Sequence, residues 1–230
     1  DSSTSRGLGD VYKRQHYLSL LFLLQRIYFG YIRGKNMKTN KVLIIIVSMF
    51  FTQLVVASDD NYVIDESHFS LGFLVEHAGY AKTLGMFKKV SGSFSYDKDK
   101  NILSNVEIII DTSSVFTNHE KRDAHLKSPD FLDVKSFPIM TFKAANNDLN
   151  KNPNKVSGEL TLLGISKKII LNAVINKIEK YPFGFTKPIV MGVSATASFN
   201  RSDFGMNYAV KKNLVGDQID LIIEFEAIKQ

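Results

Sequence analysis

The 230-residue sequence contains no cysteine. Disulfide bonds, thiolate catalysis and cysteine-ligated metal sites are therefore excluded, and so is a lipid-modified N-terminal cysteine. Tryptophan is absent as well, whereas phenylalanine is abundant: 13 of the 17 Phe residues lie beyond residue 57. The apolar content of this later part of the chain therefore depends heavily on Phe.

The chain beyond residue 57 also lacks an excess of charge of either sign. Residues 1–57 hold 8 basic and 2 acidic residues and so carry the whole net charge of +6, while residues 58–230 hold 21 of each. Nucleic-acid binding depends on a concentrated positive surface, so no nucleic-acid partner is predicted. For the same reason we interpret the pairs Lys167-Lys168 and Lys211-Lys212 as solvated charge rather than as membrane docking sites.

The N-terminal part of the chain has the pattern of a secretory leader that begins at Met37. Lys38 and Lys41 form a charged start, residues 42–51 are apolar, and small or modest residues precede a cleavage site near Ala57. We predict that residues 37–57 are a signal peptide and that the mature protein is periplasmic or secreted. The alternative is an uncleaved anchor.

Residues 1–36 fit neither a signal peptide nor a globular domain. A start rich in Gly, Ser and Arg is followed by an apolar stretch over residues 17–32 that Gln25 and Arg26 interrupt. We interpret residues 1–36 as upstream or artefactual sequence and exclude them from the fold. The alternative is a first transmembrane helix.

From residue 61 onward, apolar residues recur with a period of two, which is typical of strands with one apolar face. Turn signals such as Gly164 and Gly216-Asp217 separate these segments. About eight strands are predicted, and they lie around residues 69–75, 92–96, 106–110, 138–145, 155–163, 168–179, 190–200 and 219–228.

Only residues 118–134 break this alternation, and there a loop with a short helix over 120–126 is predicted. No linker divides residues 58–230, so one domain is expected. Eight antiparallel strands with an inner and an outer face indicate a closed barrel or a two-sheet sandwich. A barrel of this size can be filled by its own side chains or can hold one small ligand. The Phe content favours a ligand, and an ordinary Phe-rich core is the alternative.

Eight motifs in sequence order resemble one known family. They are Asp65-x-x-His68-x-x-Leu71-x-Phe73-x-Val75-x-His77, Gly85-x-Phe87, Gly92-x-Phe94-x-Tyr96-Asp97, Ile110-Asp111-x-x-Ser114-x-x-Thr117, Arg122-Asp123-x-His125-Leu126-x-Ser128-x-Asp130-Phe131-x-Asp133, Phe137-Pro138-x-Met140-Thr141-Phe142, Gly158-x-Leu160-Thr161-Leu162-x-Gly164-Ile165-x-Lys167 and Asn200-Arg201-Ser202-Asp203-Phe204-Gly205-Met206. In this order they closely resemble the YceI-like family of exported bacterial proteins, from about Tyr62 to Lys229.

The resemblance implies an all-β fold, namely an extended eight-stranded antiparallel lipocalin-like barrel with a short helical cap segment. It also implies a long internal pocket for a polyisoprenoid chain, such as a polyprenyl phosphate or a quinone tail. It implies no enzymatic activity, no cofactor other than such a lipid or quinone, and no metal. The residues predicted to bind the ligand are Phe69, Leu71, Phe73, Val75, His77, Phe87, Phe94, Ile108, Ile110, Phe131, Phe142, Leu160, Leu162, Phe199, Ile223 and Phe225.

Two polar residues are candidates for contact with the ligand's head group. His68 follows Asp65 near the start of the first strand, and we interpret it either as a pocket residue near the head group or as a buried histidine bonded to the backbone. Arg201 follows the strand that ends at Phe199. It could bind a phosphate or pair with Asp203 across the barrel mouth.

The segment His119, Glu120, Asp123 and His125 holds residue types that bind metals or assist catalysis. Its spacing matches no zinc signature, and neither Ser114 nor Ser128 lies in a nucleophile-elbow motif. We therefore predict a structural cap over one barrel end, held by Arg122, Asp123 and Asp130.

The leading functional hypothesis is an exported carrier or reservoir for isoprenoid lipid. The alternatives are a stress-related structural barrel with an incidental cavity and an accessory protein of a membrane quinone electron-transfer system. Transient contact with a membrane and a homodimer are both compatible with the first hypothesis.

Overall fold

The structure, a computed structural model, describes residues 59–230, which form one compact unit. The predictions for residues 1–36 and 37–57 concern segments outside the described residues. Within the described part, no helix combines the length and the apolar character needed to cross a membrane.

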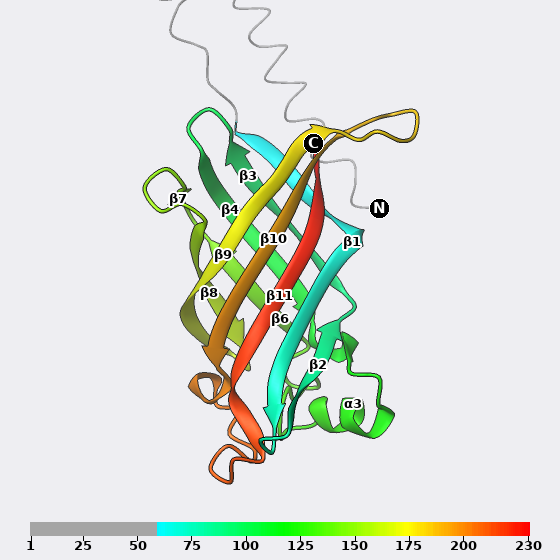
Figure 1. The fold of residues 1–230 in the computed structure, drawn as a ribbon, viewed down its shortest axis with the longest axis vertical. Helices are drawn as coiled ribbons and strands as arrows, with labels where there is room; N and C mark the ends of the chain where they lie inside the picture. Colours follow the sequence, from blue (N-terminus) through cyan, green and yellow to red (C-terminus); the bar gives the residue numbers. More distant parts are fainter. Residues whose placement is uncertain (1–58) are drawn as a thin grey trace, which may run out of the picture. The chain divides into compact units, whose positions relative to one another are not determined.

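Eight antiparallel strands form a closed barrel (Figure 1). Their order around the barrel is β11-β10-β9-β8-β6-β4-β3-β1, and pairing between β1 and β11 closes the ring. Closure leaves no free strand edge in this ring, and it decides for the barrel against the sandwich. The strands are β1 (Asp60–His77), β3 (Val90–Asp97), β4 (Ile102–Asp111), β6 (Ile139–Ala144), β8 (Lys155–Leu162), β9 (Ile165–Lys180), β10 (Ile189–Asn200) and β11 (Val215–Lys229).

Three short strands extend the sheet beyond the prediction: β2 (Ala81–Phe87), β5 (Val115–Phe116) and β7 (Asn147–Asp148). β2 pairs with the second half of β1, whereas β3 pairs with its beginning. Since only Lys88 and Lys89 separate β2 from β3, the two strands follow β1 as one bent ribbon. The sequence did not predict β5 and β7 because two residues are too few to show a period.

The predicted helix is present as α3 (Glu120–Leu126). His119 is its N-cap, and Nδ1 of this side chain accepts a hydrogen bond from the backbone N–H of Arg122. Two short 3₁₀ helices, η1 (Thr112–Ser114) and η2 (Arg201–Phe204), follow β4 and β10. α3 and the loop after η2 lie at the same end of the barrel (Figure 1).

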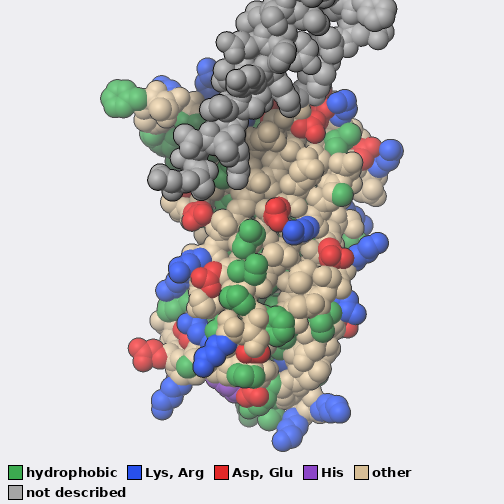
Figure 2. Space-filling view, turned by 180° about the vertical axis from the view of Figure 1, so that it is seen from behind, with side chains coloured by type: hydrophobic (Ala, Val, Ile, Leu, Met, Phe, Trp, Pro, Cys, Tyr) green, Lys and Arg blue, Asp and Glu red, His purple; other side chains and the backbone are tan. Residues whose placement is uncertain are grey.

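The alternation seen in the sequence corresponds to the two faces of the barrel wall. Cross-strand partners on β1 and β11 face inward together, for example Phe69 with Phe225 and Leu71 with Ile223. Lys, Arg, Asp and Glu side chains are interspersed on the face of the barrel that Figure 2 shows.

One irregularity interrupts β1. Its register against β11 changes between the pairs Ile64–Ala227 and Phe69–Phe225, so residues 65–68 lie opposite the single residue Glu226. Such a bulge bends the strand and turns side chains away from the regular ladder. The result is a polar segment on the outside of the barrel.

Candidate functional site

A cavity of about 650 Å³ occupies the barrel lumen, a volume typical of sites for small organic ligands. All sixteen residues that the sequence proposes for ligand binding line this cavity. Many of the inward-facing residues, such as Phe225, Ile223 and Ile108, are only partly buried although they point into the barrel. This accessibility is what an unfilled lumen produces, since a packed core would cover them.

One end of the lumen is closed by packed side chains. Tyr62 stacks on Phe94 with ring centroids 5.4 Å apart, and Tyr62, Tyr96 and Ala227 are buried without lining the cavity. Desolvation by burial raises the pKa of both tyrosines. The Tyr96 hydroxyl nevertheless has a partner, because it donates to Oδ1 of Asn101 at 2.8 Å.

The opposite end carries the polar part of the cavity wall, and we call this end the mouth. It lies where β1 ends and β11 begins, at the end of the barrel beside which α3 lies (Figure 1). The lining side chains with polar or charged groups all belong to these segments, to β2, to η2 or to the loop after η2. They are Glu76, His77, Thr83, Lys121, Arg122, His125, Arg201 and Tyr208. A long apolar molecule with one polar head would match this distribution, with its head at the mouth.

Arg201 is 1% exposed and lines the cavity near the mouth. Its guanidinium donates to four backbone carbonyls: from Nε to Gly216 at 2.7 Å, from Nη1 to Met206 at 2.8 Å, and from Nη2 to Tyr208 and Val215 at 2.7 and 2.9 Å. Desolvation by burial lowers its pKa. The predicted ion pair with Asp203 is wrong: within residues 59–230 Arg201 forms no salt bridge, because backbone oxygens occupy its donors.

The segment around α3 acts as a structural clamp at the mouth. Thr117, which is buried, donates its backbone N–H and its hydroxyl to Oδ1 of Asp123. Arg122 donates to the hydroxyl and the carbonyl oxygen of the same threonine, at 2.7 and 2.6 Å. Lys121, Arg122, His125 and Leu126 also line the cavity, so this clamp is part of the mouth.

The two histidines of this segment, His119 and His125, have different hydrogen-bond partners. His119 caps α3, whereas Nε2 of His125 lies 2.9 Å from Oδ2 of Asp130, and its ring packs edge-on against Phe131 and Tyr208. In the described residues, His119, Glu120, Asp123 and His125 do not converge on one point where a metal could bind.

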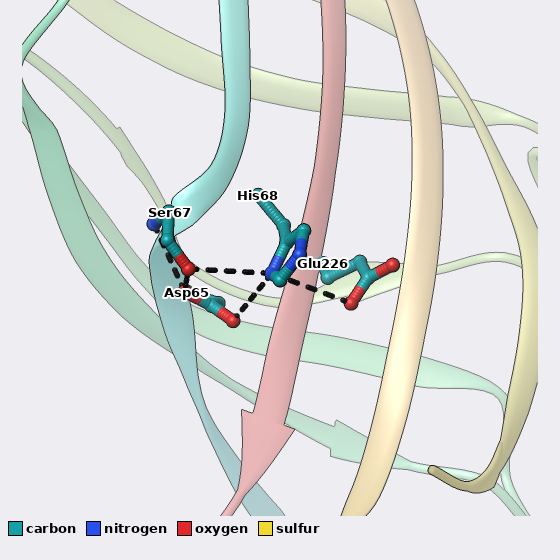
Figure 3. A network of polar contacts seen from close by, with 4 residues as sticks. All are labelled: Asp65, Ser67, His68 and Glu226. Atoms are coloured by element: carbon teal, nitrogen blue, oxygen red, sulfur yellow. Dashed lines mark hydrogen bonds and ion pairs between the residues drawn. The ribbon is translucent and has the colours of Figure 1, made fainter. Parts of the chain in front are cut away.

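His68 lies on the outer bulge and not in the cavity. Figure 3 shows His68 with Asp65, Ser67 and Glu226; Nδ1 of His68 is 2.8 Å from Oδ2 of Asp65 and 3.9 Å from Oε2 of Glu226. Both suggested positions of His68, in the pocket or buried against the backbone, are therefore wrong, because the bulge turns the side chain to solvent.

The bulge residues are the one set in the described chain whose His and carboxylate atoms, from Asp65, His68 and Glu226, lie within 4.8 Å of one another and could hold a cation. The side chains already satisfy one another. Hydrogen bonds from Ser67 and then His68 lower the pKa of Asp65 to about 2, and the bond to Asp65 raises the pKa of His68.

Sequence reasoning missed part of the cavity wall. Val193 and Ala195 line it from β10 and follow the same inward phase as Phe199, so the strand period could have identified them. Tyr208 and Leu214 also line it, but they come from an irregular loop, where no period shows which way a side chain points.

Comparison with known proteins gives a consistent result. Residues 62–227 match the family described as YceI-like domain. A UPF0312 protein of Pseudomonas savastanoi is 35% identical over 173 residues, which cover 74% of this chain and 87% of that protein.

Two solved structures share the fold. The YCEI protein of Campylobacter jejuni is 29% identical, with a TM-score of 0.57 over 67% of this chain and 90% of that chain. A polyisoprenoid binding domain from Saccharophagus degradans is 11% identical, with a TM-score of 0.51 over 75% of this chain and all of that domain. At 11% identity the likeness concerns the fold alone.

Proposed function

The chain belongs to the YceI-like domain family, and on that premise we propose that it is an exported carrier or reservoir that holds one long polyisoprenoid chain in its barrel. The observation that carries this proposal is the cavity of about 650 Å³, apolar along the barrel, closed at one end and polar only at the mouth. The description of the Saccharophagus degradans domain as polyisoprenoid binding agrees with it.

The free energy of such binding would come from the tail. Removing one five-carbon isoprene unit from water stabilises by about 4 kcal/mol, at about 0.8 kcal/mol per carbon. Several units together exceed the contribution of any head-group contact, even after the costs of association. Fifteen of the sixteen predicted residues, all but His77, are apolar and line the cavity that would hold such a tail.

The cellular source of the ligand determines the role. In a bilayer the isoprenoid tail is already out of water, so transfer into the barrel gains little net free energy. Near-balanced exchange suits a carrier or reservoir, which must both take up and release its lipid. Export after cleavage near Ala57 would place the protein in the periplasm or outside the cell, next to a membrane.

The basic side chains at the mouth indicate which kind of head group the ligand carries. Lys121 and Arg122 line this part of the cavity beside the backbone-bound Arg201, and Glu76 is the acidic residue among the lining side chains of the described chain. A phosphate head would be matched by these cations, whereas a quinone ring would not need them. We therefore favour a polyprenyl phosphate over a quinone as the ligand.

The decisive experiment is native mass spectrometry of residues 57–230, purified without detergent, followed by lipid extraction. We expect one isoprenoid per barrel, and less bound isoprenoid in Ile223→Trp, whose larger ring would narrow the lumen. Ile222→Trp is the matched control because Ile222 is the next residue on β11, is exposed, and points outward. If the parent protein binds no long-chain lipid, either co-purified or added, the proposal fails and the alternative of a structural barrel with an incidental cavity is supported. Recovery of a bound quinone would instead support the alternative of an accessory protein in a membrane quinone electron-transfer system.

A further inference from the structure

Two loops at the mouth lie side by side and present apolar side chains to solvent. The turn between β1 and β2 joins the loop that follows η2 through a hydrogen bond from the backbone N–H of Ala78 to the carbonyl oxygen of Leu214, 2.9 Å long. Tyr80 on the turn is 90% exposed, and Leu214 on the loop is 50% exposed. Both loops lie at the α3 end of the barrel (Figure 1).

The loop is held in a fixed shape, so its exposed side chains are presented rigidly. Four of the carbonyls between Met206 and Gly216 accept hydrogen bonds from the buried guanidinium of Arg201. Leu214 itself donates its N–H to the carbonyl oxygen of Ala209. Exposed apolar groups on an ordered loop mark a contact surface more strongly than the same groups on a disordered one, since less conformational entropy is lost on binding.

The charge of the two loops is of one sign. Residues 78–82 and 205–215 contain Lys82, Lys211 and Lys212 and no acidic residue. Lys82 pairs with Asp220, whereas Lys211 and Lys212 form no ion pair within residues 59–230. Lysines beside exposed apolar side chains are complementary to an anionic bilayer surface, where the lysines attract lipid head groups and the apolar groups enter the interface.

We propose that this surface, formed by Tyr80, Leu214, Lys211 and Lys212, docks the barrel mouth-first on an anionic lipid bilayer. The inference rests on the proposed function, because the mouth is where a lipid would enter and leave. It changes the interpretation of Lys211-Lys212, which composition alone assigned to solvated charge: the fold places these two charges next to exposed apolar groups at the polar end of the cavity. With only two unpaired lysines, docking is weak and reversible, as repeated lipid exchange requires.

The chain offers a matched control at its other end. The turn between β9 and β10 exposes Phe183 and Phe185, which are 71% and 107% exposed, and it lies at the end that Tyr62 and Phe94 close (Figure 1). Apolar side chains project from this turn in Figure 2 as well. Exposure alone would favour membrane docking through this turn, whereas the polar cavity lining, which includes the exposed Tyr208 and Leu214, favours docking through the mouth.

The absence of tryptophan allows a direct test. Tyr80→Trp and Phe185→Trp each create a single fluorescent reporter in residues 57–230. On adding vesicles of equimolar phosphatidylcholine and phosphatidylglycerol, we expect the emission of Tyr80→Trp to shift to the blue and that of Phe185→Trp to stay unchanged. A shift at Phe185→Trp alone, or at neither position, overturns the proposal. The readout needs no bound isoprenoid, so it remains valid even if the barrel proves to hold no lipid.

A second measurement follows transfer of a fluorescent polyprenyl phosphate from such vesicles into the barrel. Reversing both charges, Lys211→Glu with Lys212→Glu, should slow transfer about tenfold or more, since each lysine near the surface contributes on the order of a severalfold change in membrane affinity. Lys180→Glu with Lys187→Glu makes the same change of net charge at the closed end and should leave the rate unchanged. Equal rates for the parent and the Lys211/Lys212 variant, or slowing only by the closed-end variant, would contradict mouth-first docking.

Discussion

The ring of Phe73 lies directly over Gly85, its partner across β1 and β2: a Cβ added to Gly85 would come 2.2 Å from Cζ of Phe73. No larger residue fits at position 85 while the ring stays in place. The ring belongs to the cavity wall. Gly85 therefore lets the Phe73 ring lie flat against the wall, which keeps the lumen open.

Gly85→Ala should therefore move the Phe73 ring into the lumen. Forcing extra atoms into a packed core typically costs about 1–3 kcal/mol. Here we expect a loss of unfolding free energy below about 1 kcal/mol, because the ring can turn into open space. Binding of a fluorescent polyprenyl analogue should weaken at the same time. Thermal unfolding of the empty protein, measured beside a binding titration, checks both expectations.

Gly158→Ala is the control for this prediction. A Cβ at Gly158 would come 2.3 Å from Cζ of Phe142 and also 2.7 Å from the backbone oxygen of Lys143. Because the backbone must shift, the loss should lie in the range of about 1–3 kcal/mol. If Gly85→Ala destabilises as much as Gly158→Ala and leaves binding intact, Phe73 does not border open space.

Phenylalanines inside the barrel should differ in their contribution to stability. Phe225 lines the cavity and is partly accessible, whereas Phe204 is 1% exposed, packs on Phe199, and does not line it. Phe204→Ala should cost about 3–5 kcal/mol, the range for truncation in a packed core. Phe225→Ala should cost less, since part of its surface has no packing partner. Chemical denaturation of both variants, empty of ligand, gives the comparison, and equal losses would indicate a filled barrel.

The barrel and most of its wall could be predicted from the sequence because both depend on a period of two. Once Phe69, Leu71 and Phe73 are assigned to one face, the alternation on β11 assigns Ile223 and Phe225 to the same lumen. The same rule extends to β4 and β8. Long strands with one apolar face therefore carry enough information to locate the cavity wall.

The mouth could not be predicted in this way. His68 lies inside the bulge of residues 65–68, where the period of Ile64 does not continue into that of Phe69, so no period shows which way its side chain points. Arg201 was expected to meet a charged partner, since a backbone cage made of carbonyls from residues 206–216 leaves no mark in the sequence. Bulges and loops are determined by tertiary contacts, which periodicity does not report.

The ion pair between Lys82 and Asp220 should contribute a pH-dependent increment of stability. Hydrogen bonds from Lys82, Gln218 and Ser198 lower the pKa of Asp220 to about 2. A depressed carboxyl pKa stabilises the fold above the unfolded pKa of about 4, and this contribution is lost as pH falls from about 4 toward 2. The difference in Tm between the parent and Asp220→Asn should therefore shrink over this interval. Since the pair is at the surface, the difference at pH 7 should not exceed about 2–4 °C.

Asp133→Asn is a suitable control because Asp133 forms no salt bridge within residues 59–230. Its Tm is measured over the same interval, between pH 4 and 2, which is bounded by the unfolded and folded pKa of Asp220. A Tm difference for Asp220→Asn that does not change with pH would show that the carboxylate is not held in its charged form by Lys82.

The N-terminus of the mature protein is a separate prediction. Because the apolar segment of residues 42–51 is followed by small residues up to Ala57, exported material should begin at Ser58 or within about two residues of it. N-terminal sequencing of protein recovered outside the cytoplasm provides the measurement. Recovery of residues 17–32 in a membrane fraction would contradict cleavage.

Arg201 should stabilise the fold mainly by holding the mouth loop. Arg201→Lys keeps the positive charge but cannot reach four carbonyls in the same fork, so buried acceptors lose their donors. Each unsatisfied acceptor costs about 1–3 kcal/mol, and the total loss of unfolding free energy should reach at least about 2 kcal/mol. Asp203→Ala removes the partner that the sequence suggested and should change stability by less than about 0.5 kcal/mol. Urea unfolding of both variants distinguishes the two arrangements. Equal losses of unfolding free energy would support an Arg201–Asp203 ion pair, whereas a loss confined to Arg201→Lys would show that the guanidinium acts through the backbone carbonyls.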